Sequence, residues 1–345
     1  MSRRPLRLPS DAPAPLDIAS HARRGPGTSA RLKIGQIEQV RRTVRRTPEV
    51  MVKVTGGGRK VGNVAAHLTY ISHDGELDLE TDDGQRVSKA GQKDLLRDWH
   101  LDLSAGQYRP PPRSPKRPYR GIKLVHNIVL SMPAPTPPDK VQAAARVFAR
   151  EKFGLKHRYA MALHTHQQHP HVHLVVKAEG LDGSRLHIDK AMLRGWRQDF
   201  ARMMREQGIA ANATTRAVRG RSKGAERDSR YRTKRRGRSR ALREEVESIA
   251  KELVRSGTIK DPGRAKLLET RKAVVAGWLG VAILLDRQGE TALAAEVRQF
   301  VKSMPPVLTD RERLAAELVR HARAQRSAQT RRDHVVRERT PEKTR

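Results

Sequence analysis

Five of the 14 histidines in this chain lie between positions 164 and 173: His164, His166, His169, His171 and His173. Neutral imidazoles that converge in this way bind divalent ions such as Zn²⁺, Mn²⁺ or Ni²⁺. The chain contains no cysteine, so a metal site has to use histidines, carboxylates or both. A His-rich surface hairpin that binds metal incidentally is the alternative, but the regular spacing and the apolar neighbours favour a built divalent-metal site.

The histidines fall on two predicted strands, residues 159–166 and 171–177. Successive side chains on a strand point to opposite faces, so His171 and His173 share one face and Val172 and Leu174 the other. If the strands pair antiparallel around a turn centred between Gln168 and His169, His166 lies opposite His171. In that register, His164 lies opposite His173, and up to four imidazoles share one face.

The charge of the chain points to a polyanionic partner. Lys and Arg number 71 against 37 Asp and Glu, and the formal net charge is +34. Phosphates release counterions when Lys and Arg replace them, so nucleic acid is the expected partner, although a basic solvated surface is the alternative. A metal held by three histidines keeps open positions and can polarise a phosphoryl oxygen. Charge and histidines together indicate phosphodiester chemistry on DNA.

Apolar periodicity predicts an α+β fold with a central antiparallel sheet and flanking helices. We expect further strands over residues 50–54, 121–132 and 186–188, and helices over residues 60–72, 93–103, 139–153 and 190–207. The acidic segment 74–91 is expected to be a loop, and 110–118 a Pro/Arg linker.

Composition predicts five regions along the chain. We expect a disordered basic arm over residues 1–48, a catalytic domain over 49–218, a basic linker over 219–243, a small helical C-terminal region over 244–325 and a charged tail over 326–345. The N-terminus has no apolar signal segment, and the apolar run 273–285 is shorter than the ~20 residues that span a bilayer. A cytoplasmic protein without membrane insertion is therefore expected.

Four motifs resemble those of a known family. His164 is followed seven residues later by the pair His171 and His173, and Gly56–Gly58 precede the segment HLTYISHDG at 67–75. The strand 128–133 and the segment 208–220 are weaker matches. Over residues 48–222 the chain resembles the relaxases of conjugative and mobilisable DNA, which are HUH-type endonucleases, and especially the group that includes the T-DNA border endonuclease.

The resemblance implies roles for particular residues. Tyr70 would be the nucleophile, and His164, His171 and His173 would hold the metal, with Mg²⁺ or Mn²⁺ expected first and Zn²⁺ or Ni²⁺ compatible. His166 and His169 would be second-shell or accessory neighbours; many relatives carry an acidic residue where this chain has His166. Ser131 would help to hold DNA near the nick. The rival tyrosines are Tyr108, Tyr119, Tyr159 and Tyr231.

The implied reaction is a transesterification. A free tyrosine has a pKa near ~10, and a nearby metal cation favours the phenolate. Attack by Tyr70 would give a 5′-phosphotyrosyl DNA and a free 3′-hydroxyl, a link that the reverse reaction can rejoin. The resemblance implies nicking at a transfer origin in a bacterial donor cell, translocation of the protein with the DNA, and partnership with relaxosome accessory proteins and a type IV coupling protein.

Basic residues near these motifs are candidate DNA contacts: Lys53, Arg59, Lys60, Arg216 and Arg219. The glycines at 56–58 are expected to let the backbone approach DNA. His67 and His73 are expected on a solvated face of the helix that carries Tyr70. Three other functions remain open: a rolling-circle replication initiator with the same chemistry, a non-catalytic DNA-binding mobilisation protein with a structural metal, and a hydrolase that activates water.

Overall fold

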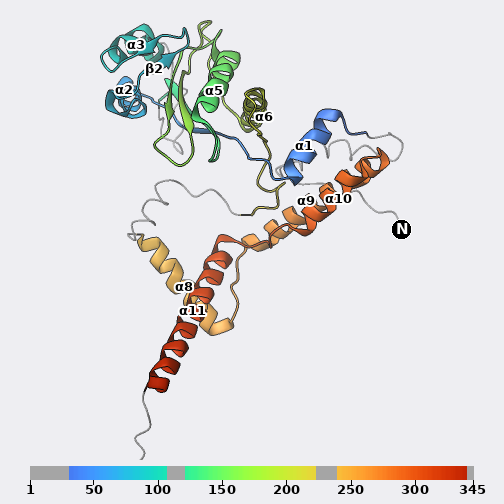
Figure 1. Cartoon of the computed structure of the whole chain (residues 1–345). Helices are drawn as coiled ribbons and strands as arrows, with labels where there is room; N and C mark the ends of the chain where they lie inside the picture. Colours follow the sequence, from blue (N-terminus) through green and yellow to red (C-terminus); the bar gives the residue numbers. More distant parts are fainter. Residues whose placement is uncertain (1–30, 107–120, 223–238, 340–345) are drawn as a thin grey trace, which may run out of the picture. The chain divides into compact units, whose positions relative to one another are not determined.

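The computed structural model describes residues 31–106, 121–222 and 239–339. The chain divides into two compact units, which are taken separately (Figure 1). We call Glu38–Thr214 the sheet unit, and Thr215–Arg345 together with the residues up to Ile37 the helical unit. The expected linker at 110–118 lies outside the described residues.

A six-stranded antiparallel sheet forms the centre of the sheet unit, in the order β1-β4-β6-β5-β2-β3. The expected α+β fold with a central antiparallel sheet is confirmed. The strands are β1 (Met51–Gly56), β2 (Leu79–Thr81), β3 (Arg86–Val87), β4 (Val125–Ser131), β5 (Tyr159–His164) and β6 (His171–Lys177).

Helices cover both faces of this sheet, with α2 and α3 on one side and α5 and α6 on the other (Figure 1). One side of β1, β4, β5 and β6 is apolar and packs on α5 and α6; on β6 these residues are Val172, Leu174 and Val176. The helices of this unit are α1 (Ile34–Val44, which begins before its boundary), α2 (Val61–Ile71), α3 (Gln92–Asp98), α4 (Leu101–Gly106), α5 (Pro138–Phe153) and α6 (Lys190–Glu206).

The second face of the sheet carries α2. Val64, Leu68 and Ile71 recur at helical spacing on one side of α2, are fully buried, and pack with residues of β5 and β6 such as Ala162 and Val175. His171 and His173 alternate with the apolar residues of β6 and therefore point to this same face. The packing thus fixes the C-terminal end of α2 over the strands that carry the histidines.

Several expected elements were wrong. Residues 34–44, expected to be disordered, form α1, where Val40 and Thr43 are buried and Thr43 accepts a hydrogen bond from Asn212 at 3.0 Å. The expected loop 74–91 contains the β2–β3 hairpin, and the expected helix 93–103 breaks near His100, which has a φ of 46°. Residues 186–188 form no strand, and an isolated bridge from Glu179 to Arg185 lies nearby.

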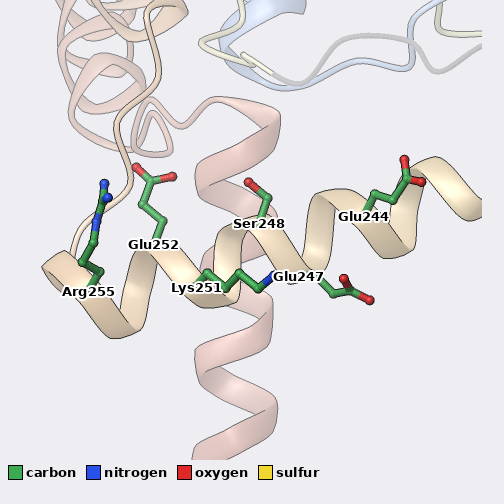
Figure 2. A pocket seen from close by; sticks show the side chains of 6 residues that line it. All are labelled: Glu244, Glu247, Ser248, Lys251, Glu252 and Arg255. Atoms are coloured by element: carbon green, nitrogen blue, oxygen red, sulfur yellow. The ribbon is translucent and has the colours of Figure 1, made fainter.

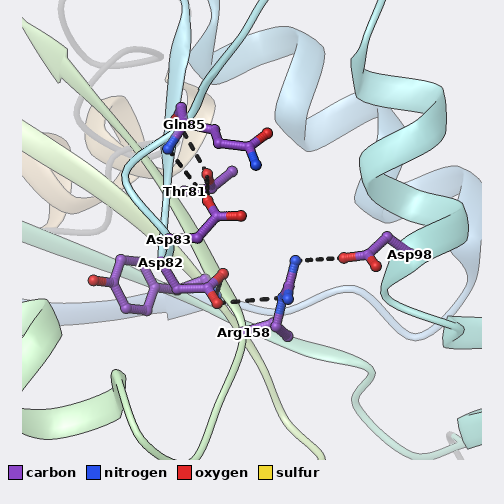
Figure 3. Close-up of polar contacts among 7 residues, drawn as sticks. Thr81, Asp82, Asp83, Gln85, Asp98 and Arg158 are labelled. Carbon is purple, nitrogen blue, oxygen red and sulfur yellow. Dashed lines mark hydrogen bonds and ion pairs between the residues drawn. The ribbon is translucent and has the colours of Figure 1, made fainter.

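Arg158, just before β5, joins the β2–β3 hairpin and α3 to the centre of the sheet (Figure 3). Its guanidinium pairs with Asp82 at 3.3 Å and donates to Asp98 of α3. Thr81 donates to Asp83 and to the Gln85 carbonyl, which closes the turn of the hairpin. The two contacts of Arg158 link segments that are 60 or more residues apart, and local apolar periodicity does not reveal such contacts.

The helical unit contains four long helices: α8 (Arg240–Ser256), α9 (Gly263–Arg287), α10 (Thr291–Lys302) and α11 (Asp310–Arg339). Trp278 of α9 is buried and donates its indole N–H to the Val218 carbonyl at 2.8 Å. Most of the expected linker 219–243 lies outside the described residues, whereas the expected tail begins inside α11. None of the helices that the structure describes has the length and apolar character of a membrane-spanning segment.

Charged residues line an open hollow of about 440 Å³ on α8 (Figure 2). Arg311 of α11 donates to Glu252 at 2.7 Å and to Ser248 at 3.2 Å, so the hollow lies where α8 and α11 pack together. Its mixed charges are typical of a helix junction. The lining residues are Glu244, Glu247, Ser248, Lys251, Glu252 and Arg255.

The stability of the sheet unit is expected to fall in acid, and His126 is one of the buried histidines that contribute to this loss. Burial beside Lys123 and Arg185 lowers the pKa of His126 to about 4, and its Nε2 donates to the Leu186 carbonyl. His126 is therefore neutral in the folded chain down to about pH 4, whereas in the unfolded chain it takes up a proton near pH 6.5. Its contribution to the free energy of unfolding is present above pH 6.5 and is lost as the pH falls towards 4. Chemical denaturation at several pH values between 7 and 4 measures the slope of the free energy of unfolding against pH.

The matching variant is His126→Leu, which removes the titrating ring. We expect the free energy of unfolding of this variant to depend less steeply on pH over this range. The difference corresponds to an uptake on unfolding that is smaller by up to roughly one proton. Equal slopes would contradict the assignment of the acid sensitivity to His126.

Candidate active site

The hairpin of β5 and β6 brings three histidines together in a register that differs from the expected one. His164 pairs with His171, and Ala162 pairs with His173. The expected pairs, His164 with His173 and His166 with His171, are wrong because β5 ends at His164. The shift is two residues, the period of a strand, so the side chains still point to the expected face.

His164, His171 and His173 form a compact set. Each offers a ring nitrogen within 4.8 Å of the other two. Their ring centroids lie 4.5 Å apart for His164 and His173, and 5.1 Å apart for the other two pairs. His164 and His171 are buried, and His173 is half-buried. Three ring nitrogens this close to one another suit one divalent ion, whose bonds to imidazole are ~2.0–2.1 Å long.

Burial keeps these three imidazoles neutral. It lowers the pKa of His164 to about 4 and that of His173 to about 3, and repulsion between the neighbouring rings adds to the effect. The pKa of His171 is lowered for the same reason. Neutral imidazoles keep the lone pair that coordinates a cation, so this set is available for metal binding at neutral pH.

Hydrogen bonds from the opposite ring nitrogens fix two of the rings. His164 donates from Nε2 to the Ile71 carbonyl at 2.7 Å, and His171 donates from Nδ1 to the His169 carbonyl at 3.0 Å. In each ring the other nitrogen therefore keeps its lone pair. Nδ1 of His173 is buried and has no hydrogen-bond partner within the described residues. Oriented rings and an unpaired buried nitrogen are the pattern of a metal site with its outer hydrogen bonds in place.

Tyr70 of α2 lies beside this set. Its side chain is 56% exposed, and its ring lies edge-on to His173 with the centroids 6.0 Å apart. Tyr159 is buried and packs on the opposite face of the sheet, among the residues that contact α5 and α6. The other rivals, Tyr108, Tyr119 and Tyr231, lie outside the described residues. Of the two described tyrosines, Tyr70 is therefore the one beside the histidines.

His67 does not lie on a solvated helix face as expected. Its ring stacks on Tyr70 with the centroids 5.9 Å apart and contacts His173 edge-on at 6.3 Å. Nε2 of His67 is buried without a hydrogen-bond partner in the described part of the chain, and burial lowers its pKa. The spacing of three residues from Tyr70 indicated this proximity, but only the packing of α2 on the sheet shows the contact with His173.

Two of the candidate DNA-binding residues lie on the same face of the sheet as the histidines, at positions that are in register with them across the strands. Ser131 pairs with His171, and its buried hydroxyl donates to the Pro170 carbonyl at 3.2 Å. Lys53 of the edge strand β1 pairs with Val129, which pairs with His173. Two strand spacings put the Cα atom of Lys53 about 10 Å from that of His173. The side chain of Lys53 is exposed.

Gly57 and Gly58, before α2, have a structural role, whereas a Cβ on Gly56 would meet nothing within 4 Å. The expected approach of this segment to DNA stays a prediction. A Cβ on Gly57 would lie 2.2 Å from the Val125 carbonyl oxygen, and one on Gly58 would lie 2.5 Å from Val64. The chain itself therefore occupies the space beside these glycines. Arg59 donates to the Gly121 carbonyl, and Lys60 is exposed at the start of α2.

Four other expected site residues lie outside the three-histidine set. Arg216 and Arg219 belong to the helical unit. His169 accepts a hydrogen bond at Nδ1 from the Ala134 N–H at 3.1 Å, in the connection between β5 and β6. His166 lies in the same connection and is exposed, and it meets His73 and His164 in a second group of three histidines.

Part of this chain is similar to proteins of known function. Residues 113–209 match the family model described as relaxase, MobA/VirD2-like, nuclease domain. The T-DNA border endonuclease VirD2 of Rhizobium radiobacter is 30% identical over 188 residues, which cover 50% of this chain and 43% of the relative. VirD2 of Agrobacterium fabrum is 28% identical over 188 residues, covering 50% and 41%. The chain spans less than half the length of these relatives.

Among solved structures, the MobM relaxase domain, bound to plasmid pMV158 oriT DNA and Mn, has a TM-score of 0.35 and 12% identity, covering 53% of this chain and 97% of that one. The family model covers Ser131 and the three histidines, whereas Tyr70 precedes it. Over residues 113–209 the chain is therefore similar to a relaxase nuclease domain of the MobA/VirD2-like family.

Proposed function

We propose that this chain nicks one DNA strand at a transfer origin by attack of Tyr70 on a phosphodiester. One observation carries the proposal: α2 places the exposed Tyr70 ring 6.0 Å from His173, on the face where three neutral histidines converge. A hydrolase that activates water has no need of an exposed tyrosine at this place. A DNA-binding protein with a structural metal has no need of one either.

The proposed reaction balances without a nucleotide cofactor or water. The Tyr70 oxygen forms a bond to phosphorus and loses its proton, the bond from phosphorus to the 3′-oxygen breaks, and that oxygen takes up a proton. The products are a 5′-phosphotyrosyl strand and a free 3′-hydroxyl. One phosphodiester replaces another, so the reverse reaction can rejoin the strand.

His164, His171 and His173 would hold a divalent ion through three neutral nitrogens. When bound, such an ion supplies positive charge that offsets the charge of the attacked phosphate and favours the phenolate of Tyr70. Mg²⁺ prefers oxygen ligands, whereas Mn²⁺, Zn²⁺ and Ni²⁺ accept imidazole. We therefore place Mn²⁺ ahead of Mg²⁺ and keep Zn²⁺ and Ni²⁺ as candidates.

The proposed substrate is single-stranded DNA. Accessory DNA-binding proteins and the coupling protein of a type IV secretion system are the proposed partners, by similarity to relaxases of conjugative elements. The donor-cell cytoplasm and translocation of the protein with the DNA belong to the same proposal.

An oligonucleotide assay tests this function. The chain is incubated with a labelled single strand that spans the transfer origin of its own element, with Mn²⁺ or Mg²⁺, and the products are separated in denaturant. We expect a labelled protein–DNA adduct and a fragment ending in a 3′-hydroxyl. Cleavage without an adduct would indicate hydrolysis, and binding without cleavage would indicate an accessory protein; either result would overturn the proposal.

Lys53 is expected to contact the DNA backbone next to the metal site. Lys53→Ala removes one phosphate contact, so the slope of the logarithm of the binding constant against the logarithm of salt concentration should shrink by about 0.7 for a single strand. Fluorescence anisotropy across a salt series measures it. Lys190→Ala, at the start of α6 on the opposite face of the sheet, is the matched control and should leave the slope unchanged. Equal slopes for both variants would remove Lys53 from the DNA path.

A further inference from the structure

A second group of three histidines shares His164 with the proposed metal ligands, and its other two members have no part in the reaction described above. His73, His164 and His166 each offer a ring nitrogen within 4.8 Å of the other two. The ring of His73 lies 4.4 Å, between centroids, from both His164 and His166. His73 follows α2, and His166 follows β5, so two distant segments of the chain build the group around the buried His164.

A well-anchored turn holds His73 in this position. Ser72 is fully buried; its hydroxyl accepts from Gln92 of α3 at 2.9 Å and donates to the Thr69 carbonyl at 3.0 Å. His73 and Asp74 have φ angles of 49° and 57°, in the left-handed region that side chains other than glycine rarely adopt. The surrounding contacts thus keep His73 in an unfavourable backbone conformation that directs its ring to His164 and His166.

We propose that His73, His164 and His166 form a second metal position, which takes a late first-row divalent ion such as Co²⁺, Ni²⁺ or Zn²⁺ and competes for His164. Three imidazoles suit these ions. A neutral imidazole has one lone pair, so His164 can coordinate one ion at a time. An ion in the second position therefore removes His164 from the set with His171 and His173. This competition rests on the proposed function; the second site itself does not.

The second position is reached from solvent. His166 is exposed and His73 is half-buried, and an open hollow of about 600 Å³ adjoins His73 and Tyr70. Asp74 and Glu76 also line this hollow, and their negative charge raises the local concentration of cations. The open side gives an ion access to His73 from solvent.

Co²⁺ titration followed by visible absorbance tests the second site in a double variant, His171→Ala with His173→Ala. This variant keeps all three ligands of the second position, so we expect it to bind one Co²⁺. Adding His73→Ala is expected to weaken that binding about tenfold or more. Adding instead His187→Ala, an exposed histidine outside both groups, is the control and should change nothing. Absence of Co²⁺ binding, or equal binding with and without His73, would overturn the proposal.

A second measurement uses the chain with the inner histidines intact and covers the case in which the double variant does not fold. Excess Co²⁺ or Zn²⁺ is expected to inhibit Mn²⁺-supported nicking, and His73→Ala with His166→Ala is expected to raise the half-inhibiting concentration about tenfold or more. Inhibition that is unchanged in this variant would overturn the competition for His164. A chain that does not nick at all would defeat the proposed function, while the Co²⁺ titration would still decide the second site.

Discussion

Tyr70→Phe is expected to abolish the covalent protein–DNA adduct and to lower nicking by at least about a thousandfold, because it removes the nucleophile itself. The substitution removes one oxygen from a side chain that is 56% exposed, so folding is expected to be unchanged. Phenylalanine also keeps the edge-on ring contact with His173. Single-turnover nicking of a labelled origin oligonucleotide, read in denaturing gels, measures the loss.

Tyr159→Phe is the matched control. Tyr159 is the other described tyrosine and packs on the opposite face of the sheet, so its variant is expected to nick within about twofold of the unchanged chain. Tyr70→Phe should also keep its affinity for the single strand, since the Lys and Arg contacts that supply most of it are unchanged. An adduct that survives in Tyr70→Phe would show that another residue attacks the phosphate.

The second large effect is expected from the metal ligands. His171→Ala or His173→Ala removes one of three neutral nitrogens within 4.8 Å of one another, so the affinity for Mn²⁺ and the nicking rate are both expected to fall by at least about a hundredfold. Affinity for the single strand and its dependence on salt should remain close to those of the unchanged chain. Metal binding is measured by calorimetry and nicking by the oligonucleotide assay.

His187→Ala is the control, because His187 is exposed and belongs to neither group of three histidines. Both ligand variants alter residues of β6, so circular dichroism has to show that each remains folded. Full nicking by a folded His173→Ala chain would defeat the metal assignment. Nicking that a chelator abolishes and Mn²⁺ restores would support it.

Much of this site could be predicted from local pattern. Alternation along a strand placed His164, His171 and His173 on one face, and a register error of two residues left that result intact, because the side-chain period of a strand is also two. The apolar spacing of residues 60–72 also predicted the helix that carries Tyr70, whereas the exposure of this side chain is known only from the structure. Such properties depend on neighbours a few residues apart, which the sequence displays directly.

The residue pattern by itself therefore determined the central strands and the histidine face, and the family resemblance supplied Tyr70 as the candidate nucleophile. Only the tertiary structure decided what lies beside them. His67 contacts His173, His73 joins His164 and His166, and Gly57 makes room for Val125. Each of these contacts depends on how the region around α2 packs against strands that lie far away in the chain. Packing of that kind is set by burial over the whole unit, and no short pattern of residues records it.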